Sequence, residues 1–575
     1  STYTGALSIA NGNTLTVTGN WTYNAANFDA GTSTLKLSNN SNVTFTPGSV
    51  NYYNLEIASS ESGTNALTVS GTATTTNNLV ISSGISSTGI NTGTINVGGN
   101  IAVTDADYGT NASSFHTATI NLNGSGNQMI SSSGGALPNV TVNKTSGTLS
   151  LQGTIPVDRN WTWTAGSLDA GTSTLKFLNR AAITFTPGSV NYYNLEIAAN
   201  SSAINSDFTI SGTATTTNNL LISDGDNSSD MKTGTINVGG NVSISDADYG
   251  TANIGTATIN LNGSGDQTMF SSSGGALPNI TVDKTSGTLS LNGTVIVGGN
   301  WTWTAGSLDA GTSTLKFLNR AAITFTPGSV NYYNVDISSN GCCTNADFTI
   351  SGTATTTNNL IINGGDGSHD MKSGTINVSG NISITSSNYD SGSVGTATTT
   401  LSGSGSQSIS SSGGLLPNLS VNKSSGTATI DSNVTVGGAL SVTNGELRHN
   451  AYTLQIDSTA TISSGGTLSD YATASSTIKF GSTITNNGTM ILDGGGTSCG
   501  DFDYVLLRST TDGTQRSWSG SGTFNIQDTD LKDMGATSGA VTVRSGTNSG
   551  NNGGSWSFNS NCLPSASFDN DFSSW

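Results

Sequence analysis

One stretch of this sequence occurs twice without change and a third time with substitutions. NWTWTAGSLDAGTSTLKFLNRAAITFTPGSVNYYN occupies both Asn160–Asn194 and Asn300–Asn334, and a related copy begins at Asn20. The copies start at residues 20, 160 and 300, so the period is 140 residues. A fixed period of this kind indicates a repeat architecture. We therefore expect one repeating body rather than several unrelated globular domains.

A shorter pattern repeats inside each module. GTSTLKFLNRAAITF at Gly171 resembles GTATINLNGSGDQTMF at Gly255, and NYYNLEI at Asn191 resembles ALPNITV at Ala276. Short runs of alternating apolar residues recur about every ten residues, separated by Gly, Asn, Ser or Thr. Alternation bounded by turn formers predicts half-buried strands, and the repeats show no helical spacing.

Sequential short strands joined by small polar turns predict a fold in which each coil stacks on the previous one. The fold class we expect is all-β, a right-handed parallel β-helix (β-solenoid) built from three modules into an elongated rod. Charged residues make up 9% of the chain and Gly contributes 74 of 575 residues, which favours a packed β array over disorder. Tandem β-sandwiches are the alternative, but the half-module repeat and the lack of linkers count against them.

The repeat also predicts how the chain is divided. We expect an open N-terminal coil at 1–19, modules at 20–159, 160–299 and 300–438, further coils at 439–496, C-terminal coils with a cap at 497–564, and a tail at 565–575.

Charge and hydropathy exclude two classes of partner. The formal net charge of −18 argues against nucleic acid, because a phosphate-binding surface needs clustered Lys and Arg. No run approaches the roughly 18 apolar residues of a membrane-spanning helix. We therefore expect no nucleic-acid partner and no membrane span.

Several motifs resemble a known class of repeat proteins. GGNWTWTAGSLDAGTSTLKFLNR, GTATINLNGSGDQTMF and NNLLI are similar to the repeats of large secreted bacterial β-helix surface proteins of the adhesin or haemagglutinin-like class. GTNSGNNGGSWSF, at Gly546–Phe558, resembles the closing segments of such proteins. The resemblance implies an extracellular, cell-surface structural protein, such as a stalk, a fibre subunit or an adhesin, that contacts other copies of itself or surface glycans.

The competing function is a polysaccharide lyase or hydrolase on the same scaffold. Its basic candidates, Arg180, Arg320, Lys36, Lys176 and Lys316, recur with the module, whereas a catalytic site is normally singular. The three histidines, His116, His369 and His449, fall at unrelated points of the repeat and are interpreted as surface positions. We therefore predict no catalytic residues, no enzyme activity and no cofactor.

Acidic residues in some turns make calcium the one metal worth considering, because Ca²⁺ prefers carboxylate oxygens. The weak candidates are Asp105, Asp107, Asp246, Asp248, Asp224, Asp226 and Asp230. Asp105 and Asp107 of module one recur as Asp246 and Asp248 of module two. Module three has Ser386, Ser387 and Asn388 at the matching place. A solvated acidic turn is therefore the preferred interpretation.

Four cysteines are too few for a disulfide scaffold in a chain of this length. Cys342 and Cys343 are adjacent in a variable turn, whereas Cys499 and Cys562 both lie in the non-repeating C-terminal part. A Cys499–Cys562 bridge would imply an oxidising compartment. Two free buried thiols remain the alternative.

The aromatic residues of the repeat have two interpretations: an exposed row of rings that binds sugars, or buried side chains of the core. Trp161 and Trp163 align with Val242 and Ile244 of the half-module, and Trp301 repeats the pattern. Because Trp buries a large apolar area, core packing is the preferred interpretation.

The ends of the chain suggest head-to-tail assembly into filaments. Strand-forming residues begin in the N-terminal coil itself. The unpaired N–H and C=O groups of an open coil edge can pair with a strand of another chain. The candidate contact residues are Leu7, Ile9, Leu15, Val17, Phe568, Phe572 and Trp575. Upstream residues that cap the first coil, or a tail that folds back on its own subunit, are the alternatives.

Overall fold

The structure is a computed structural model of the 575-residue chain. It describes residues 7–24, 28–39, 42–59, 67–83, 90–104, 117–178, 182–198, 207–223, 231–245, 255–271, 276–319, 322–339, 347–365, 371–387, 395–471, 474–495 and 505–559.

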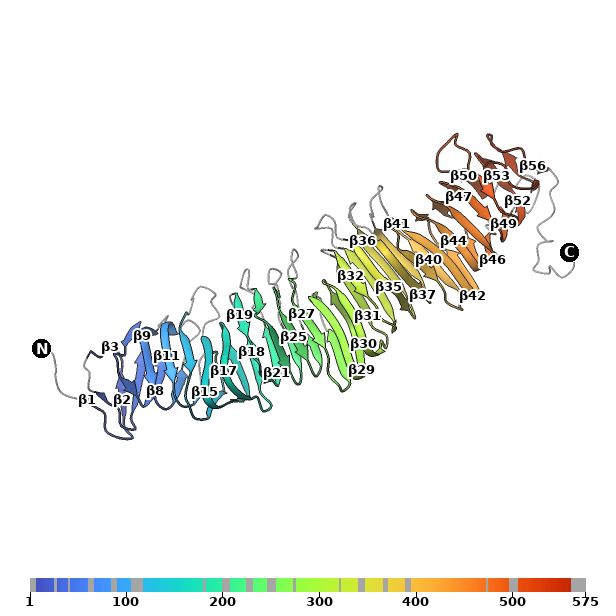
Figure 1. Ribbon diagram of the computed structural model, residues 1–575. Helices are drawn as coiled ribbons and strands as arrows, with labels where there is room; N and C mark the ends of the chain where they lie inside the picture. The colour runs from blue at the N-terminus through green and yellow to red at the C-terminus, as the bar shows by residue number, and fades with distance from the viewer. Residues whose placement is uncertain are drawn as a thin grey trace. The chain divides into compact units, whose positions relative to one another are not determined.

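The described residues form strands and turns without a helix, and the strands pair in parallel. They stack as a β-solenoid of about 19 turns, which confirms the parallel β-helix predicted from the repeat. Two compact units are present: residues 1–296 with 304–309, and residues 297–303 with 310–575. Each unit is described by itself below (Figure 1).

The strands of the first unit stack on one another (Figure 1), and residues of the same kind pair in register from strand to strand. One ladder runs through Leu15, Leu35, Leu55, Leu79, Ile101 and Ile130. Its strands are β2 (Thr14–Val17), β5 (Thr34–Asn39), β8 (Asn54–Ser59), β10 (Leu79–Ser83), β12 (Ile101–Val103) and β14 (Gln128–Ser132). The alternation of apolar and polar residues therefore sends one side of each strand into a continuous core.

A second ladder in the same unit begins at the end of the first module and continues through the second module. It passes from Ile155 through Leu175, Leu195, Leu220, Val242 and Met269 to Leu291, in six steps. The strands are β16 (Thr154–Val157), β18 (Thr174–Phe177), β21 (Asn194–Ala198), β24 (Leu220–Ser223), β26 (Val242–Ile244), β28 (Gln267–Ser271) and β29 (Asn279–Val297).

The second unit contains one inward-facing column that passes through twelve strands. In order, its residues are Leu315, Val335, Leu360, Ile382, Ile409, Ile430, His449, Asp470, Leu492, Ile526, Val543 and Phe558. Ten of them are apolar, so His449 and Asp470 interrupt an otherwise apolar column. Eleven steps of about 4.8 Å give the column a length of about 50 Å.

Most of the strands that carry this column are short, and three of them, β42, β44 and β46, have ten or more residues. They are β31 (Thr314–Asn319), β34 (Asn334–Ser339), β36 (Leu360–Gly365), β38 (Ile382–Ser387), β40 (Gln407–Ser411), β42 (Asn418–Ile430), β44 (Leu440–His449), β46 (Ala460–Asp470), β49 (Thr489–Asp493), β52 (Thr523–Gln527), β54 (Val541–Arg544) and β56 (Trp556–Asn559).

The repeated tryptophans belong to the core, as the alignment with Val242 and Ile244 predicted. Trp161 and Trp301 are fully buried, and Trp163 and Trp303 are nearly so. The indole of Trp161 donates a hydrogen bond to the Tyr192 hydroxyl (3.1 Å), which in turn donates to the carbonyl of Pro187 (3.0 Å). This chain of bonds recurs in the other modules through Trp21–Tyr52–Pro47 and Trp301–Tyr332–Pro327.

Asparagines at the turns join one coil to the next. In module two, Asn194 Oδ1 accepts the backbone N–H of Asn219 (3.0 Å), and Asn219 Oδ1 accepts that of Asn241 (2.8 Å). Asn241 Oδ1 then accepts the N–H of Thr268 (2.8 Å). Because each side chain satisfies a backbone donor of the following turn, the recurrent Asn residues have a structural explanation.

Candidate functional site

A cavity of about 820 Å³ lies among the last turns of the second unit. The cavity forms where two neighbouring strands pair over only part of their length. β49 and β52 pair over five residues and β54 and β56 over four, but β52 and β54 pair only at Ile526 with Val543 and Gln527 with Arg544. The preceding parts of β52 and β54, Thr523–Asn525 and Val541–Thr542, are therefore not joined by a ladder and border the cavity.

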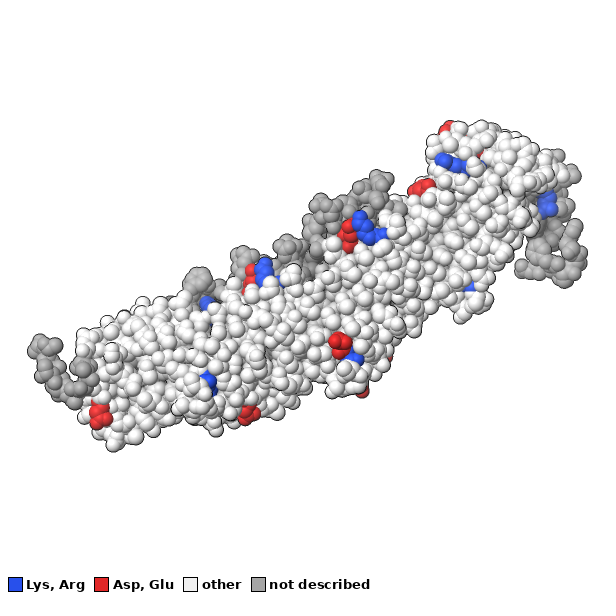
Figure 2. All heavy atoms as spheres, in the orientation of Figure 1, with Lys and Arg blue, Asp and Glu red and all other residues white. Residues whose placement is uncertain are grey.

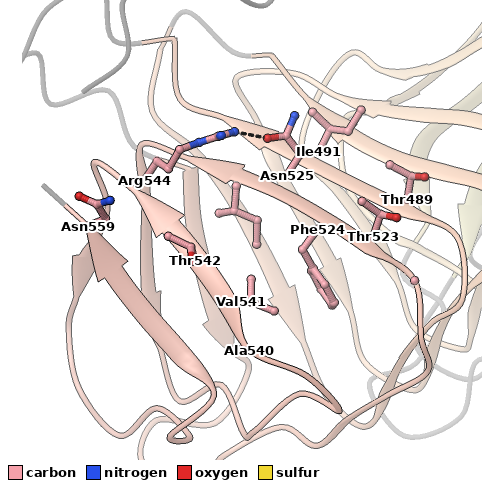
Figure 3. Close-up of a pocket in the computed structure, with 12 residues that line it drawn as sticks. Thr489, Ile491, Thr523, Phe524, Asn525, Ala540, Val541, Thr542, Arg544 and Asn559 are labelled. Carbon is pink, nitrogen blue, oxygen red and sulfur yellow. Dashed lines mark hydrogen bonds between the residues drawn. The ribbon is translucent and has the colours of Figure 1, made fainter. Parts of the chain in front are cut away.

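Side chains of four strands surround this space (Figure 3). They are Thr489, Ile491, Thr523, Phe524, Asn525, Ile526, Val541, Thr542, Arg544 and Asn559, with Gly522 and Ala540 at the adjoining turns. The hydroxyls and amides can donate and accept hydrogen bonds, and the guanidinium adds a charged planar donor. The cavity is thus equipped to hold a polar ligand that also has apolar surface.

Arg544 is the charged residue among those that line the cavity. Its guanidinium donates a hydrogen bond to Asn525 Oδ1, and Figure 3 shows its side chain extending toward Asn525 at the edge of the cavity. Asp493 pairs in register with Gln527, which in turn pairs with Arg544, and its side chain is almost completely buried. Burial raises the pKa of this carboxyl, while the Gly495 backbone N–H and the nearby Arg544 charge act in the opposite direction.

An aromatic cluster supports the wall of the cavity. The rings of Phe524 and Trp518 lie 5.6 Å apart, and those of Phe524 and Trp556 lie 6.0 Å apart, in edge-to-face arrangements. The Trp556 indole donates to the carbonyl of Gly535 (2.8 Å). These contacts fix the position of the Phe524 ring, which is half-buried and forms part of the lining.

A second polar cluster lies inside the apolar column. His449 Nδ1 and Asp470 Oδ2 are 2.7 Å apart, and both side chains are 0% exposed. Ser476, at the start of β47 (Ser476–Phe480), donates to the same carboxylate oxygen at 2.5 Å. His449 Nε2 is buried and has no hydrogen-bond partner among the described residues. The prediction that His449 is a surface residue is wrong.

Three buried lysines form a third feature, which the sequence analysis did not identify. Lys284 Nζ donates to the carbonyls of Gly263 (2.7 Å) and Gly265 (2.8 Å) and to Gln267 Oε1 (2.7 Å). Lys144 and Lys423 make the same three bonds to Gly124, Gly126 and Gln128, and to Gly403, Gly405 and Gln407. Burial lowers the pKa of all three lysines.

We call this arrangement of a lysine, a glutamine and two glycine carbonyls the lysine clamp. The glutamine also reaches the previous turn, because Gln267 Nε2 donates to the carbonyls of Val238 (2.9 Å) and Gly240. The clamp therefore joins three successive turns. The motif GxGxQ followed 16 or 17 residues later by Lys was the sequence signal for it.

The module-periodic lysines have the architectural role that their spacing predicted. Lys36 pairs with Glu56 (2.7 Å), Lys176 with Glu196 (2.7 Å) and Lys316 with Asp336 (3.3 Å). Each pair consists of directly opposite residues on neighbouring parallel strands.

Many of the predicted site residues lie outside the described part of the chain. These are all seven calcium candidates (Asp105, Asp107, Asp224, Asp226, Asp230, Asp246 and Asp248), the cysteines Cys499 and Cys562, the tail residues Phe568, Phe572 and Trp575, and also His116, His369, Arg180, Arg320, Cys342 and Cys343. The predictions made for them stay predictions. Within the described ranges, no cluster of three or more His, Cys, Asp or Glu residues could hold a metal ion.

The N-terminal assembly candidates are described, and they differ from their counterparts in later turns. Leu7, Ile9, Leu15 and Val17 are all partly exposed. Leu289, Leu291, Val295 and Val297, which occupy the matching sequence positions, are 0–1% exposed.

The visible face in Figure 2 is mostly uncharged, and its few Lys/Arg and Asp/Glu side chains lie in small groups, several of them containing both signs of charge. Among the residues that are described, no helix is long and apolar enough to cross a membrane. Comparison with known proteins gives no match: no protein family, no curated protein and no solved structure resembles the chain significantly.

Proposed function

We propose that this chain is an extracellular structural protein, a surface stalk, fibre subunit or adhesin in which repeated modules provide length. The observation that carries the proposal is the recurrence of the same bonds in all three modules. Among the described residues, the Trp–Tyr–Pro chain, the lysine clamp and the cross-strand Lys–carboxylate pair each occur once in every module.

These bonds connect successive turns rather than converge on one point. Trp161 and Tyr192, for example, are 31 residues apart and buried together. A set of contacts that is repeated along the stack stabilises the interfaces between turns, and in repeat proteins these interfaces supply much of the stability. Such repetition favours a mechanical role over catalysis.

The proposal includes head-to-tail self-association. Its support is the partial exposure of Leu7, Ile9, Leu15 and Val17 on the first described strands. A further parallel strand from the C-terminal region of another copy would bury them, and such a heterologous contact builds filaments. An extracellular location is proposed from the resemblance of the repeats to secreted surface proteins.

Electron microscopy of the purified chain over a concentration series tests the assembly. We expect particles at low concentration and end-to-end filaments at high concentration. Leu7→Asp with Ile9→Asp should abolish the filaments and leave the circular dichroism unchanged. Ser8→Asp is the matched control, because Ser8 lies on the same strand but is exposed. A chain that stays monomeric at every concentration would contradict the assembly.

The competing function, a polysaccharide lyase or hydrolase, is tested separately. The chain is incubated with acidic and neutral polysaccharides, and unsaturated and reducing sugar ends are measured. We expect no release above that of a heat-denatured sample. Release that depends on the folded chain would overturn the structural proposal.

A further inference from the structure

We propose that the cavity between β52 and β54 binds an acidic saccharide. This inference goes beyond the structural role, which stands whether or not the cavity has a ligand. It rests on the size of the cavity, on the chemistry of its walls and on the fixed position of Arg544, the one charged side chain among the described residues that line it.

The size of the cavity suits a small ligand. Ligand-binding cavities typically measure about 300–1,000 Å³, and this cavity measures about 820 Å³. Neighbouring strands in a parallel sheet lie about 4.8 Å apart, which is comparable with the length of one sugar ring. The four strands that line the cavity could therefore present side chains to successive rings of a short oligosaccharide.

The walls match the two kinds of surface that a sugar presents. Thr489, Thr523 and Thr542 supply hydroxyls, and Asn525 and Asn559 supply amides, all of which can exchange hydrogen bonds with sugar hydroxyls. Apolar side chains, Phe524 among them, offer surface to the C–H faces of the rings. Figure 3 shows Thr489 and Thr523 next to each other on one side of the cavity, and Asn559 and Arg544 on the other.

The charge of the walls selects an acidic sugar. Arg544 lines the cavity and no carboxylate does so among the described residues. A guanidinium is planar and can bind a carboxylate or sulfate through two parallel hydrogen bonds. Its bond to Asn525 and its pairing position beside Gln527 hold the side chain at the edge of the cavity. A uronic acid or a sulfated sugar would place its anionic group there.

A nucleic acid is a poorer fit, because one guanidinium cannot neutralise several phosphates. A peptide would add a strand between β52 and β54, and its recognition would depend on backbone pairing rather than on Arg544. These occupants predict different responses to the variants below.

Isothermal titration calorimetry with the full chain tests the proposal. Cellobiouronic acid and cellobiose form the matched ligand pair, since they differ in one carboxylate, and acetate supplies the carboxylate alone. We expect the acid to bind, cellobiose to bind at least about tenfold more weakly, and acetate to show no binding at the same concentration. Raising the salt concentration should weaken the binding of the acid.

Three variants locate the site. Arg544→Met should weaken binding of the acid by about tenfold to a hundredfold, and Arg544→Lys should retain part of it. Arg448→Met is the matched control, because Arg448 lies on β44, outside the cavity, and should leave the affinity unchanged. Thermal unfolding of each variant shows whether its fold is intact.

The proposal is overturned if no saccharide binds the intact chain at millimolar concentration. It is also overturned if the acid and the neutral sugar bind equally, or if Arg448→Met reduces binding as much as Arg544→Met in folded protein. Binding of acetate with the affinity of the disaccharide would exclude a saccharide site.

Discussion

His449 Nδ1 lies 2.7 Å from Asp470 Oδ2, and both residues occupy successive positions of a column whose other ten members are apolar. The neighbours in this column are Ile430 on one side and Leu492 on the other. A polar pair thus occupies two successive positions of an otherwise apolar column in the second unit. Burial of a polar group without a hydrogen-bond partner costs free energy, so each of these two side chains depends on the other.

We predict that Asp470→Leu and His449→Leu each destabilise the second unit, the latter by about 3–5 kcal/mol, because it leaves a buried carboxylate without its imidazole partner. The double variant should restore most of the loss, since it continues the aliphatic column. The measurement is a double-mutant cycle from denaturant unfolding. Ile430→Leu is the control for packing changes at the neighbouring position. Additive effects of the two single variants would show that the pair is not coupled.

The lysine clamp gives a second stability prediction. Lys284→Met removes the donor shared by Gly263, Gly265 and Gln267, and we expect a loss of about 1–3 kcal/mol for each acceptor that is left unsatisfied. Lys176→Met is the matched control, since Lys176 is partly exposed and pairs with one glutamate, and should cost less than about 1 kcal/mol. Equal losses in the two variants would contradict a special role for the clamp.

The buried tyrosines predict a loss of stability at alkaline pH. Burial raises the pKa of Tyr52 to about 12, and it raises the pKa of Tyr192 and Tyr332 as well. A raised pKa in the folded state means that the stabilisation is complete below the unfolded pKa of about 10 and is lost as the pH rises toward 12. For Tyr52 alone the loss is about 2–3 kcal/mol.

This prediction is checked by following phenolate absorbance and circular dichroism together. Exposed tyrosines should ionise near pH 10 without a change in fold. The buried tyrosines should ionise only as the strand signal disappears. Ionisation of all 14 tyrosines in one step near pH 10, with the fold intact, would show that the three are not protected.

The disulfide prediction concerns residues outside the described ranges. If Cys499 and Cys562 are bridged, the intact mass of the chain purified without a reducing agent should rise by about two hydrogen masses on reduction, and peptide mapping should recover the two cysteines in one linked pair. Alkylation of both thiols without prior reduction would show that they are free.

The sequence was sufficient to predict the architecture, for a physical reason. Alternation such as Leu175-Lys176-Phe177 sends one set of side chains inward, and the period of 140 residues repeats that pattern in register. The alignment of Trp161 with Val242 likewise predicted a core position, because equivalent positions of stacked coils share one environment.

The polar features were harder to predict. Lys284 lies within β29 but directly precedes Thr-Ser-Gly, so its local sequence resembles an exposed turn, and only the stacking of turns brings it to Gln267. His449 and Asp470 are 21 residues apart, which is one turn of the coil. Their contact cannot be predicted from this separation unless the register of the strands is known. The cavity depends on the short pairing of β52 with β54, which no residue pattern encodes.

The central claim is that the modules are interchangeable units of length. Deletion of Asn160–Gly299 tests it directly, because Asn300–Asn334 repeats the removed Asn160–Asn194 residue for residue. Small-angle scattering of the intact and shortened chains gives their maximum dimensions. We predict a decrease of about 30 Å, from six ladder steps of about 4.8 Å each, with an unchanged circular dichroism spectrum per residue. An unfolded product, or a folded one whose maximum dimension does not decrease, would contradict the account.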